Sequence, residues 1–149
     1  MISHTHTAPV HSATVKAPKL TRNQNLVLET LSKTEFPLSA YTILDQLREE
    51  GFRAPLQVYR ALDKLLEYGL IHRLESLNAF VACAHPHHQE HGHLHGIAAF
   101  AICDQCGQAS EFSEPDIEVC VQHWTQKNHF HPTKTTLEIR GICANCAHA

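Results

Sequence analysis

Two Cys-x-x-Cys pairs, CDQC at 103–106 and CANC at 143–146, restrict the fold of this 149-residue sequence more than any other feature. Each pair can form a tight turn whose two sulfurs point at one ion, and two such turns complete a closed tetrahedral zinc site. We therefore predict a structural Zn²⁺ held by Cys103, Cys106, Cys143 and Cys146. The alternative of two unrelated redox pairs is disfavoured because Gly107 and Gly141 flank the two turns. An ion held in this way contributes directly to folding.

Composition and charge narrow the classes of protein that the sequence can encode. Hydrophobic residues make up 43% of the chain, enough to bury a core. No stretch approaches the roughly 18 consecutive apolar residues of a membrane span, so we expect a soluble cytoplasmic protein. Six cysteines and 14 histidines then indicate metal ligands rather than disulfides.

The charge of the chain is distributed unevenly. The net charge is −3, but residues 1–82 carry nine Lys and Arg against eight Asp and Glu, whereas residues 83–149 carry three Lys and Arg against seven Asp and Glu. Contact with nucleic acid is therefore expected from the first half.

Apolar periodicity in the first half predicts three short helices joined by tight turns. Thr21 and Ser39 are suited to cap the first two helices. The third is expected over residues 54–68, beginning at a proline that fits a first helical turn and presenting apolar side chains on one face. Three such helices are typical of a helix-turn-helix core.

Two strand-like runs follow the third helix, LIHRL and AFVAC, on either side of residues 75–78. A hairpin in this position forms a wing, so residues 20–82 are predicted to be a winged helix-turn-helix domain. In such a domain the third helix enters the major groove of DNA and the hairpin lies near the backbone. Residues 1–19 lack periodicity and are expected to form a disordered tail.

A change of composition to AHPHHQEHGHLHG marks a histidine-rich hinge at residues 83–96. Residues 97–149 are predicted to form a small α/β dimerisation domain with a helix at 114–128. Cys120 on this helix is expected to lie in the apolar core of the domain. Strands are expected at AAFAIC, 109–112 and 135–142. The predicted fold class is thus α+β, with an N-terminal winged helix-turn-helix followed by a small α/β dimerisation domain.

For DNA recognition, the exposed face of the third predicted helix carries Gln57, Tyr59, Arg60 and Lys64. Arginine can hydrogen-bond to guanine or to a phosphate, and tyrosine can contact the backbone or a thymine methyl group. The alternative is a merely solvated charged face, which the winged context disfavours. We therefore predict that these four residues contact DNA.

A second metal site is predicted where the hairpin meets the hinge. If the hairpin turns around Ser76-Leu77, His72 faces Val81 across it, and Cys83 lies two residues further on the same face. These two side chains could then share an ion, with further ligands from the hinge and the second domain, so that occupation would hold both domains in one arrangement. Three alternatives stay open: an ordinary surface histidine, a small buried apolar cysteine, and a hinge that is only a polar loop.

Six segments together form a distinctive set: LTRNQNLVLETL, SAYTILDQLRE, VYRALDKLLEYGLIHRLES, the histidine-rich linker, FAICDQCG and GICANC. They cover about residues 20–147, and ordinary winged helices lack the combination of VYRAL, a hairpin and CxxCG. The set resembles the ferric-uptake-regulator superfamily of bacterial repressors, and within it the zinc-uptake regulators most closely.

This resemblance implies a homodimer that, when loaded with metal, binds an AT-rich palindromic operator in double-stranded DNA and represses transcription of zinc-uptake genes. It implies that Tyr59 and Arg60 contact DNA, with Tyr41 as a further contact. It also implies a regulatory Zn²⁺ besides the structural one, held by a His before the wing, a Cys after it, a linker His and a Glu beyond the first CxxC. These ligands map onto His72, Cys83, His95 and Glu111, with His93 as the substitute for His95.

Three other kinds of function compete with a zinc-dependent repressor. Iron, manganese or peroxide sensing is disfavoured by the sulfur of Cys83, because thiolate suits Zn²⁺ better. A zinc-storage or chaperone protein would hold several ions weakly and bind no operator. A zinc deaminase, suggested by His88-Gln89-Glu90 before CDQC, is disfavoured because Cys143 and Cys146 would close the coordination sphere that catalysis needs open. We therefore expect no enzymatic activity and no small-molecule substrate other than the metal ion.

Overall fold

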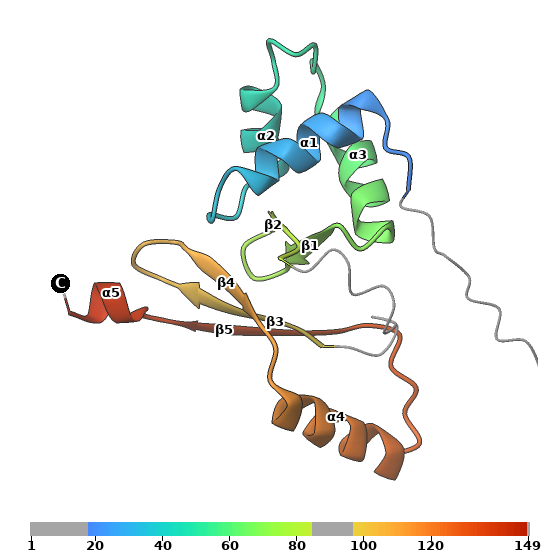
Figure 1. Cartoon of the computed structure of the whole chain (residues 1–149), viewed down its shortest axis with the longest axis vertical. Helices are drawn as coiled ribbons and strands as arrows, with labels where there is room; N and C mark the ends of the chain where they lie inside the picture. The colour runs from blue at the N-terminus through green and yellow to red at the C-terminus, as the bar shows by residue number, and fades with distance from the viewer. Residues whose placement is uncertain (1–17, 85–96, 149) are drawn as a thin grey trace, which may run out of the picture.

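Ten helices and strands make up residues 18–84 and 97–148, the part of the chain that a computed structural model describes (Figure 1). They follow in the order α1 (Arg22–Ser32), α2 (Ala40–Gln46), α3 (Pro55–Glu67), β1 (Ile71–Leu74), β2 (Ala79–Ala82), β3 (Ile97–Cys103), β4 (Ala109–Phe112), α4 (Pro115–Lys127), β5 (Thr135–Gly141) and α5 (Ala144–Ala147). Three helices and a hairpin followed by a small sheet with helices confirm the predicted α+β class. In these described ranges no helix is long and apolar enough to cross a membrane.

The first two helices begin at the caps that the sequence predicts. At the start of α1, the backbone N–H of Gln24 donates to the Thr21 hydroxyl at 3.3 Å, and the Thr21 N–H donates to the Gln24 side-chain oxygen at 2.9 Å. At the start of α2, the N–H of Thr42 donates to the Ser39 hydroxyl at 3.1 Å. A cap of this kind contributes about 1 kcal/mol to helix stability, so local sequence is enough to place both helix starts.

One apolar core joins the three helices to the hairpin. Its fully buried members include Val27, Leu31, Ile43, Phe52, Val58, Leu62, Leu65 and Ile71. The hairpin is tied into this core by Phe80 of β2, which exchanges two backbone hydrogen bonds with Leu38 at 3.0 and 2.8 Å. The wing is therefore packed as part of the N-terminal unit, α1 to β2.

The second unit is built on a three-stranded sheet in the order β4-β3-β5. β3 pairs antiparallel with β4 and parallel with β5, with Cys103 opposite Gly141 at the end of the parallel pair. Because parallel strands run in the same direction, the chain leaves β3 and β5 at the same edge of the sheet. This arrangement brings the segments after Cys103 and after Gly141 together.

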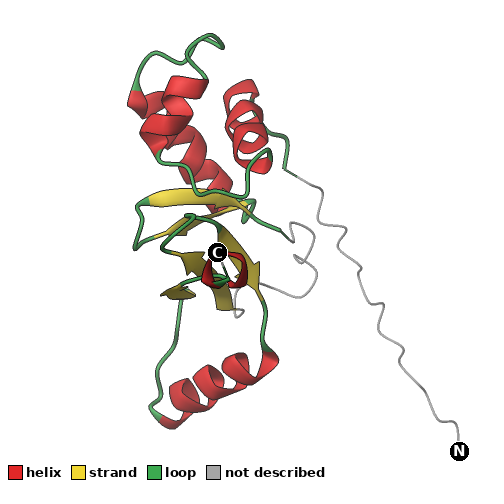
Figure 2. Ribbon diagram, turned by 90° about the vertical axis from the view of Figure 1, so that its left-hand side faces the viewer, coloured by secondary structure: helices red, strands yellow, loops and turns green. Residues whose placement is uncertain are grey.

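Helix α4 connects β4 to β5 but stands apart from the sheet in both views (Figures 1 and 2). Within α4 only Thr125 is buried, whereas Val119 and Trp124 are 61% and 57% exposed. Cys120 is also exposed, so the prediction of a core position for it was wrong. The helical spacing was right, but the apolar face has no partner within the described part of this chain.

The two units meet along the wing, which lies between the helices and the sheet (Figure 1). Leu74 of β1 is buried with Phe100 and Ile102 of β3 in a second apolar cluster. A polar contact adds to it, because the side-chain N–H of Gln108 donates to the Glu35 carboxylate at 2.8 Å. The wing thus shares one core with the helices and a second with the sheet.

Candidate metal centres

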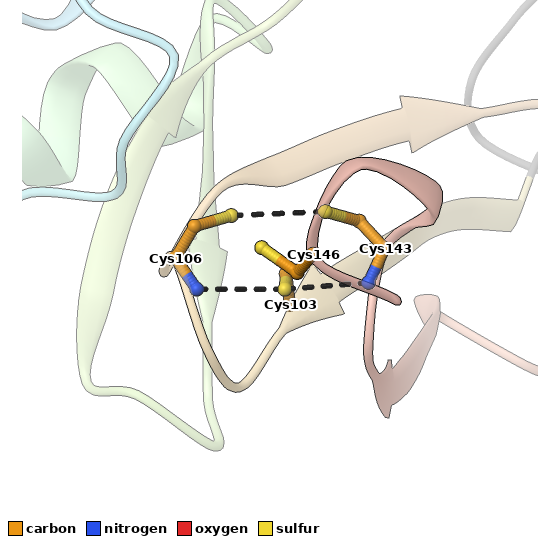
Figure 3. A group of neighbouring side chains, drawn as sticks. All are labelled: Cys103, Cys106, Cys143 and Cys146. Carbon is orange, nitrogen blue, oxygen red and sulfur yellow. Dashed lines mark hydrogen bonds between the residues drawn. The ribbon is translucent and has the colours of Figure 1, made fainter. Parts of the chain in front are cut away.

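The four cysteines of the two CxxC pairs come together at the edge of the sheet where β3 and β5 end (Figure 3). Cys103 is the last residue of β3, and Cys106 follows in a turn. The turn needs Gly107, whose φ of +79° is costly for other residues. Cys143 follows β5 by two residues and occupies the N-cap position of α5, on which Cys146 lies. The parallel pairing of β3 with β5 therefore builds this four-cysteine site.

The distances in the four-cysteine site suit a tetrahedral ion. All four sulfurs lie within 4.8 Å of one another, and the Cys106 and Cys143 sulfurs are 3.9 Å apart. Zinc–sulfur bonds of about 2.3 Å place two sulfurs of a tetrahedron about 3.8 Å apart. All six cysteines of the chain are free thiols rather than disulfides. The donor set therefore fits Zn²⁺ with every coordination position filled, which is the chemistry of a structural ion.

Backbone amides in the four-cysteine site stabilise the thiolate form of Cys103. The N–H groups of Cys106 and Cys143 donate to the sulfur of Cys103 at 3.5 and 3.3 Å (Figure 3) and lower the pKa of Cys103 to about 6. The pKa of Cys146 is raised to about 12, because its thiol hydrogen-bonds to the Cys143 sulfur and lies close to the other two. Four thiolates so close repel one another, so a cation is needed to deprotonate all of them.

A second group of ligands lies where the two units meet. His72 of β1, Cys83 just after β2 and Glu111 of β4 place one ligand atom each within 4.8 Å of one another. The hairpin register pairs His72 with Val81, which confirms the predicted pairing. A hydrogen bond from the Cys83 N–H to the Leu70 carbonyl, at 2.9 Å, fixes Cys83 beside the hairpin. Two ligands thus come from the N-terminal unit and one from the sheet.

The surroundings of this second group fit a metal ion as well. The side chains of His72 and Glu111 are only 18% and 13% exposed, and His72 Nε2 lies 3.5 Å from a Glu111 oxygen. Nε2 is buried, and its 3.5 Å contact with Glu111 is longer than a good hydrogen bond, so the atom is poorly satisfied unless it binds something else. The other Glu111 oxygen accepts a hydrogen bond from the Ala84 N–H at 2.9 Å, which orients the carboxylate. We call this group the junction site.

Sulfur, nitrogen and oxygen donors together fit Zn²⁺ in the junction site, because zinc accepts all three and commonly takes four ligands. The described residues supply three of them. The predicted hinge ligands His93 and His95 lie outside the described residues.

His72 is protonated at neutral pH in the metal-free junction site. Burial alone would lower its pKa, but polar contacts with Cys83 and Glu111, and the negative charge at these two groups, outweigh burial and raise the pKa from 6.5 to about 9. A raised pKa stabilises the metal-free fold below pH 6.5, and this contribution is lost as the pH rises through about 9.

Zinc binding at the junction site is therefore expected to displace a proton from His72, because a metal ligates only the neutral ring. Zinc affinity should rise from pH 7 toward pH 9, by about tenfold per pH unit for each displaced proton. Calorimetry in buffers of different ionisation enthalpy, with the four-cysteine site filled, counts the protons released. His72→Gln should release one proton fewer; equal release would contradict this assignment.

The predicted DNA contacts lie on the surface of the N-terminal unit, with one exception. Tyr41 and Tyr59 are 62% and 36% exposed, and Arg60 is exposed beside Tyr59 on α3. Lys64 is exposed but forms an ion pair with Glu67 at 2.6 Å. Gln57, by contrast, is half-buried, and its side-chain oxygen accepts hydrogen bonds from the N–H groups of Arg53 and Ala54 at 2.7 and 3.1 Å. Its amide oxygen therefore caps α3.

Two residues near the junction site escaped the sequence analysis. Phe100 of β3 packs edge-on against the His72 ring, with centroids 5.2 Å apart. Glu138 of β5 accepts hydrogen bonds from the turn of the wing. Alternation along each strand indicates which residues share a face, but nothing in either strand indicates that the wing covers that face.

Known proteins resemble this chain over most of its length. Residues 16–140 match the Ferric uptake regulator family. The Zinc uptake regulation protein of Escherichia coli (strain K12) is 38% identical over 129 residues, which are 86% of this chain and 72% of that protein. The crystal structure of holo XcZur is 39% identical, with a TM-score of 0.78 and 90% of both chains covered. A zinc uptake regulator complexed with zinc and DNA is 35% identical, with a TM-score of 0.79 over 87% of this chain and 84% of that one. This chain belongs to the ferric uptake regulator family.

Proposed function

We propose that this protein is a cytoplasmic, zinc-responsive repressor, which binds operator DNA as a metal-loaded homodimer and represses zinc-uptake genes. The observation that carries this proposal is the junction site, because His72 lies in the winged-helix unit, Cys83 is hydrogen-bonded to that unit at the start of the hinge, and Glu111 lies in the sheet. The similarity to a zinc uptake regulation protein, and to a zinc uptake regulator complexed with zinc and DNA, supports it. The proposed activity is regulated binding rather than catalysis.

Two zinc ions per subunit have distinct places in this proposal. Cys103, Cys106, Cys143 and Cys146 hold the structural ion. His72, Cys83 and Glu111 hold the sensed ion, with His95, or His93 in its place, as the fourth ligand. When bound there, Zn²⁺ supplies a link between the two units that neither unit can make alone. The Cys83 sulfur favours zinc over iron or manganese.

The remaining parts of the proposal assign the DNA and dimer surfaces. Residues 20–82 read DNA through Tyr41, Tyr59, Arg60 and Lys64, with Gln57 at the start of α3; residues 83–96 are the hinge, and residues 97–149 dimerise. The exposed apolar side chains Val119 and Trp124 of α4 and Ile139 of β5 support a homodimer, because a second copy would cover them.

A gel shift on an AT-rich palindromic duplex, with added zinc and with chelator, tests the proposed function. Zinc is expected to promote sequence-specific binding, and chelation of the junction-site ion to reverse it. A zinc-storage protein would instead take up several ions with no shift of the duplex. Iron or manganese promoting the shift better than zinc would contradict zinc as the sensed metal.

In the same assay Arg60→Ala is expected to weaken binding about 5- to 150-fold, the equivalent of roughly 1–3 kcal/mol for one specific arginine contact. Lys134→Ala removes one positive charge from an exposed position between α4 and β5 and is the matched control. Equal losses in the two variants would show that Arg60 contributes only general charge.

A further inference from the structure

Three side chains form a row across the sheet beneath the wing. Phe100 of the central strand is paired with Glu111 of β4 on one side and with Glu138 of β5 on the other. Residues paired across neighbouring strands point to the same face of a sheet. This face carries Phe100 and Ile102, which are buried with Leu74 of the wing.

The row contacts the wing at both of its ends. At the open end, Glu111 and Phe100 contact His72. At the turn, the two Glu138 oxygens accept hydrogen bonds from the backbone N–H groups of Glu75 and Ser76 at 2.7 and 3.2 Å. Bonds from N–H groups to a carboxylate are roughly twice as strong as those between neutral groups. Glu138 therefore anchors the turn of the wing.

We propose that Glu138 is a positioning residue, which sets the zinc affinity of the junction site by holding the turn of the wing on the sheet. This inference rests on the proposed function, because it takes His72, Cys83 and Glu111 as the sensing ligands. The wing is a short paired hairpin, so an anchored turn keeps its other end, with His72 and Cys83, facing Glu111. Apparent affinity falls in proportion to the time that the ligands spend apart.

Direct attraction between Glu138 and the metal is too weak to account for such an effect. Glu138 and Glu111 are two strands apart, about 10 Å at a strand spacing of about 4.8 Å. This separation is about one Debye length at physiological salt, where charges near the surface are largely screened. Position rather than charge is therefore the expected source of the effect, and substitutions can separate the two.

Two substitutions of Glu138 test the proposal in the full chain with the four-cysteine zinc in place. Glu138→Gln removes the charge and turns an amide N–H₂ toward one of the donors. Glu138→Asp keeps the charge but draws it back by one carbon–carbon bond. We expect both to weaken Zn²⁺ binding at the junction site about five- to tenfold, within the usual range of coupling between sites. A competing fluorescent chelator measures this affinity without DNA.

Amide hydrogen exchange of Glu75 and Ser76, followed by NMR, is the second readout. Both amides should exchange faster in the two variants, while the retained four-cysteine zinc reports an intact sheet. Glu49→Gln, at an exposed position after α2, is the matched control and should change neither readout. Because coupling is reciprocal, Zn²⁺ at the junction site of the unaltered chain should also slow the exchange of both amides.

Three outcomes would each overturn the positioning role. The first two are an unchanged zinc affinity in Glu138→Gln and an unchanged zinc affinity in Glu138→Asp. The third is amide exchange of Glu75 and Ser76 that does not change when zinc is added to the unaltered chain. The last measurement needs no variant, so it decides the question even if substitution unfolds the sheet. None of these outcomes depends on an operator, and a failed gel shift would not produce them. The failure of this inference and that of the repressor proposal are thus distinguishable.

Discussion

A chain carrying Cys143→Ser is expected to lose its tightly held zinc and, with it, the folded sheet. Cys143 lies where the chain leaves β5, and its loss removes both a sulfur ligand and the link from β5 to the end of β3. Structural zinc in small domains is bound with about 10–16 kcal/mol, as much as the roughly 5–15 kcal/mol that stabilises a whole domain. Zinc content after dialysis and amide hydrogen exchange in β3 and β5, followed by NMR, would report the loss.

Cys120→Ser is the matched control for this prediction, because Cys120 is an exposed thiol on α4 outside both groups of ligands. It should keep one equivalent of zinc through dialysis and unaltered amide exchange in β3 and β5. The helices of the N-terminal unit have a core of their own, so much of the helical circular dichroism should survive in Cys143→Ser. A Cys143→Ser chain that retains its zinc and its folded sheet would refute the structural role of the four-cysteine site.

Cys83→Ser is expected to abolish zinc-dependent DNA binding while leaving the four-cysteine zinc in place. The hydroxyl is a hard, weakly acidic ligand, whereas zinc at the junction site relies on a sulfur beside His72 and Glu111. Changes to groups that only support a ligand cost about 10- to 100-fold in metal affinity, so losing the ligand itself should cost more than about 100-fold. The chelator competition and the gel shift on the palindromic duplex measure the two effects.

The contrast with Cys143→Ser makes this second prediction specific. Both variants lose one sulfur, but Cys83→Ser should retain one equivalent of zinc, the folded sheet and normal resistance to unfolding. Zinc-dependent DNA binding that persists in Cys83→Ser would contradict the sulfur ligand and reopen the identity of the sensed metal.

Short-range signals account for what the sequence predicts well. Thr21 and Ser39 begin their helices because a side chain only has to reach three residues along the chain. The position of the hairpin turn determines that His72 faces Val81, because residues on opposite strands pair outward from the turn. The four cysteines were predicted for a related reason, since each CxxC is a local turn with two sulfurs.

The short helix α5 and the exposure of Cys120 show where such signals end. The four residues of α5 follow Cys143 without a capping side chain, so local sequence hardly marks them. The apolar spacing of α4 indicates a face that packs against something, but not whether the partner lies in the same chain. In the described structure that partner is absent from this chain, and the prediction for Cys120 failed for this reason.

By itself, then, the sequence determined the order of helices and strands from α1 to β5, the hairpin register and the two CxxC turns. Only the tertiary structure decided that β3 and β5 run in parallel, and that the row of Glu111, Phe100 and Glu138 lies beneath the wing. The physical reason is range. Caps, turns and periodicity act within a few residues, whereas the docking of the wing on the sheet brings Glu75 within 2.7 Å of Glu138, 63 positions away, through the packing of two apolar clusters.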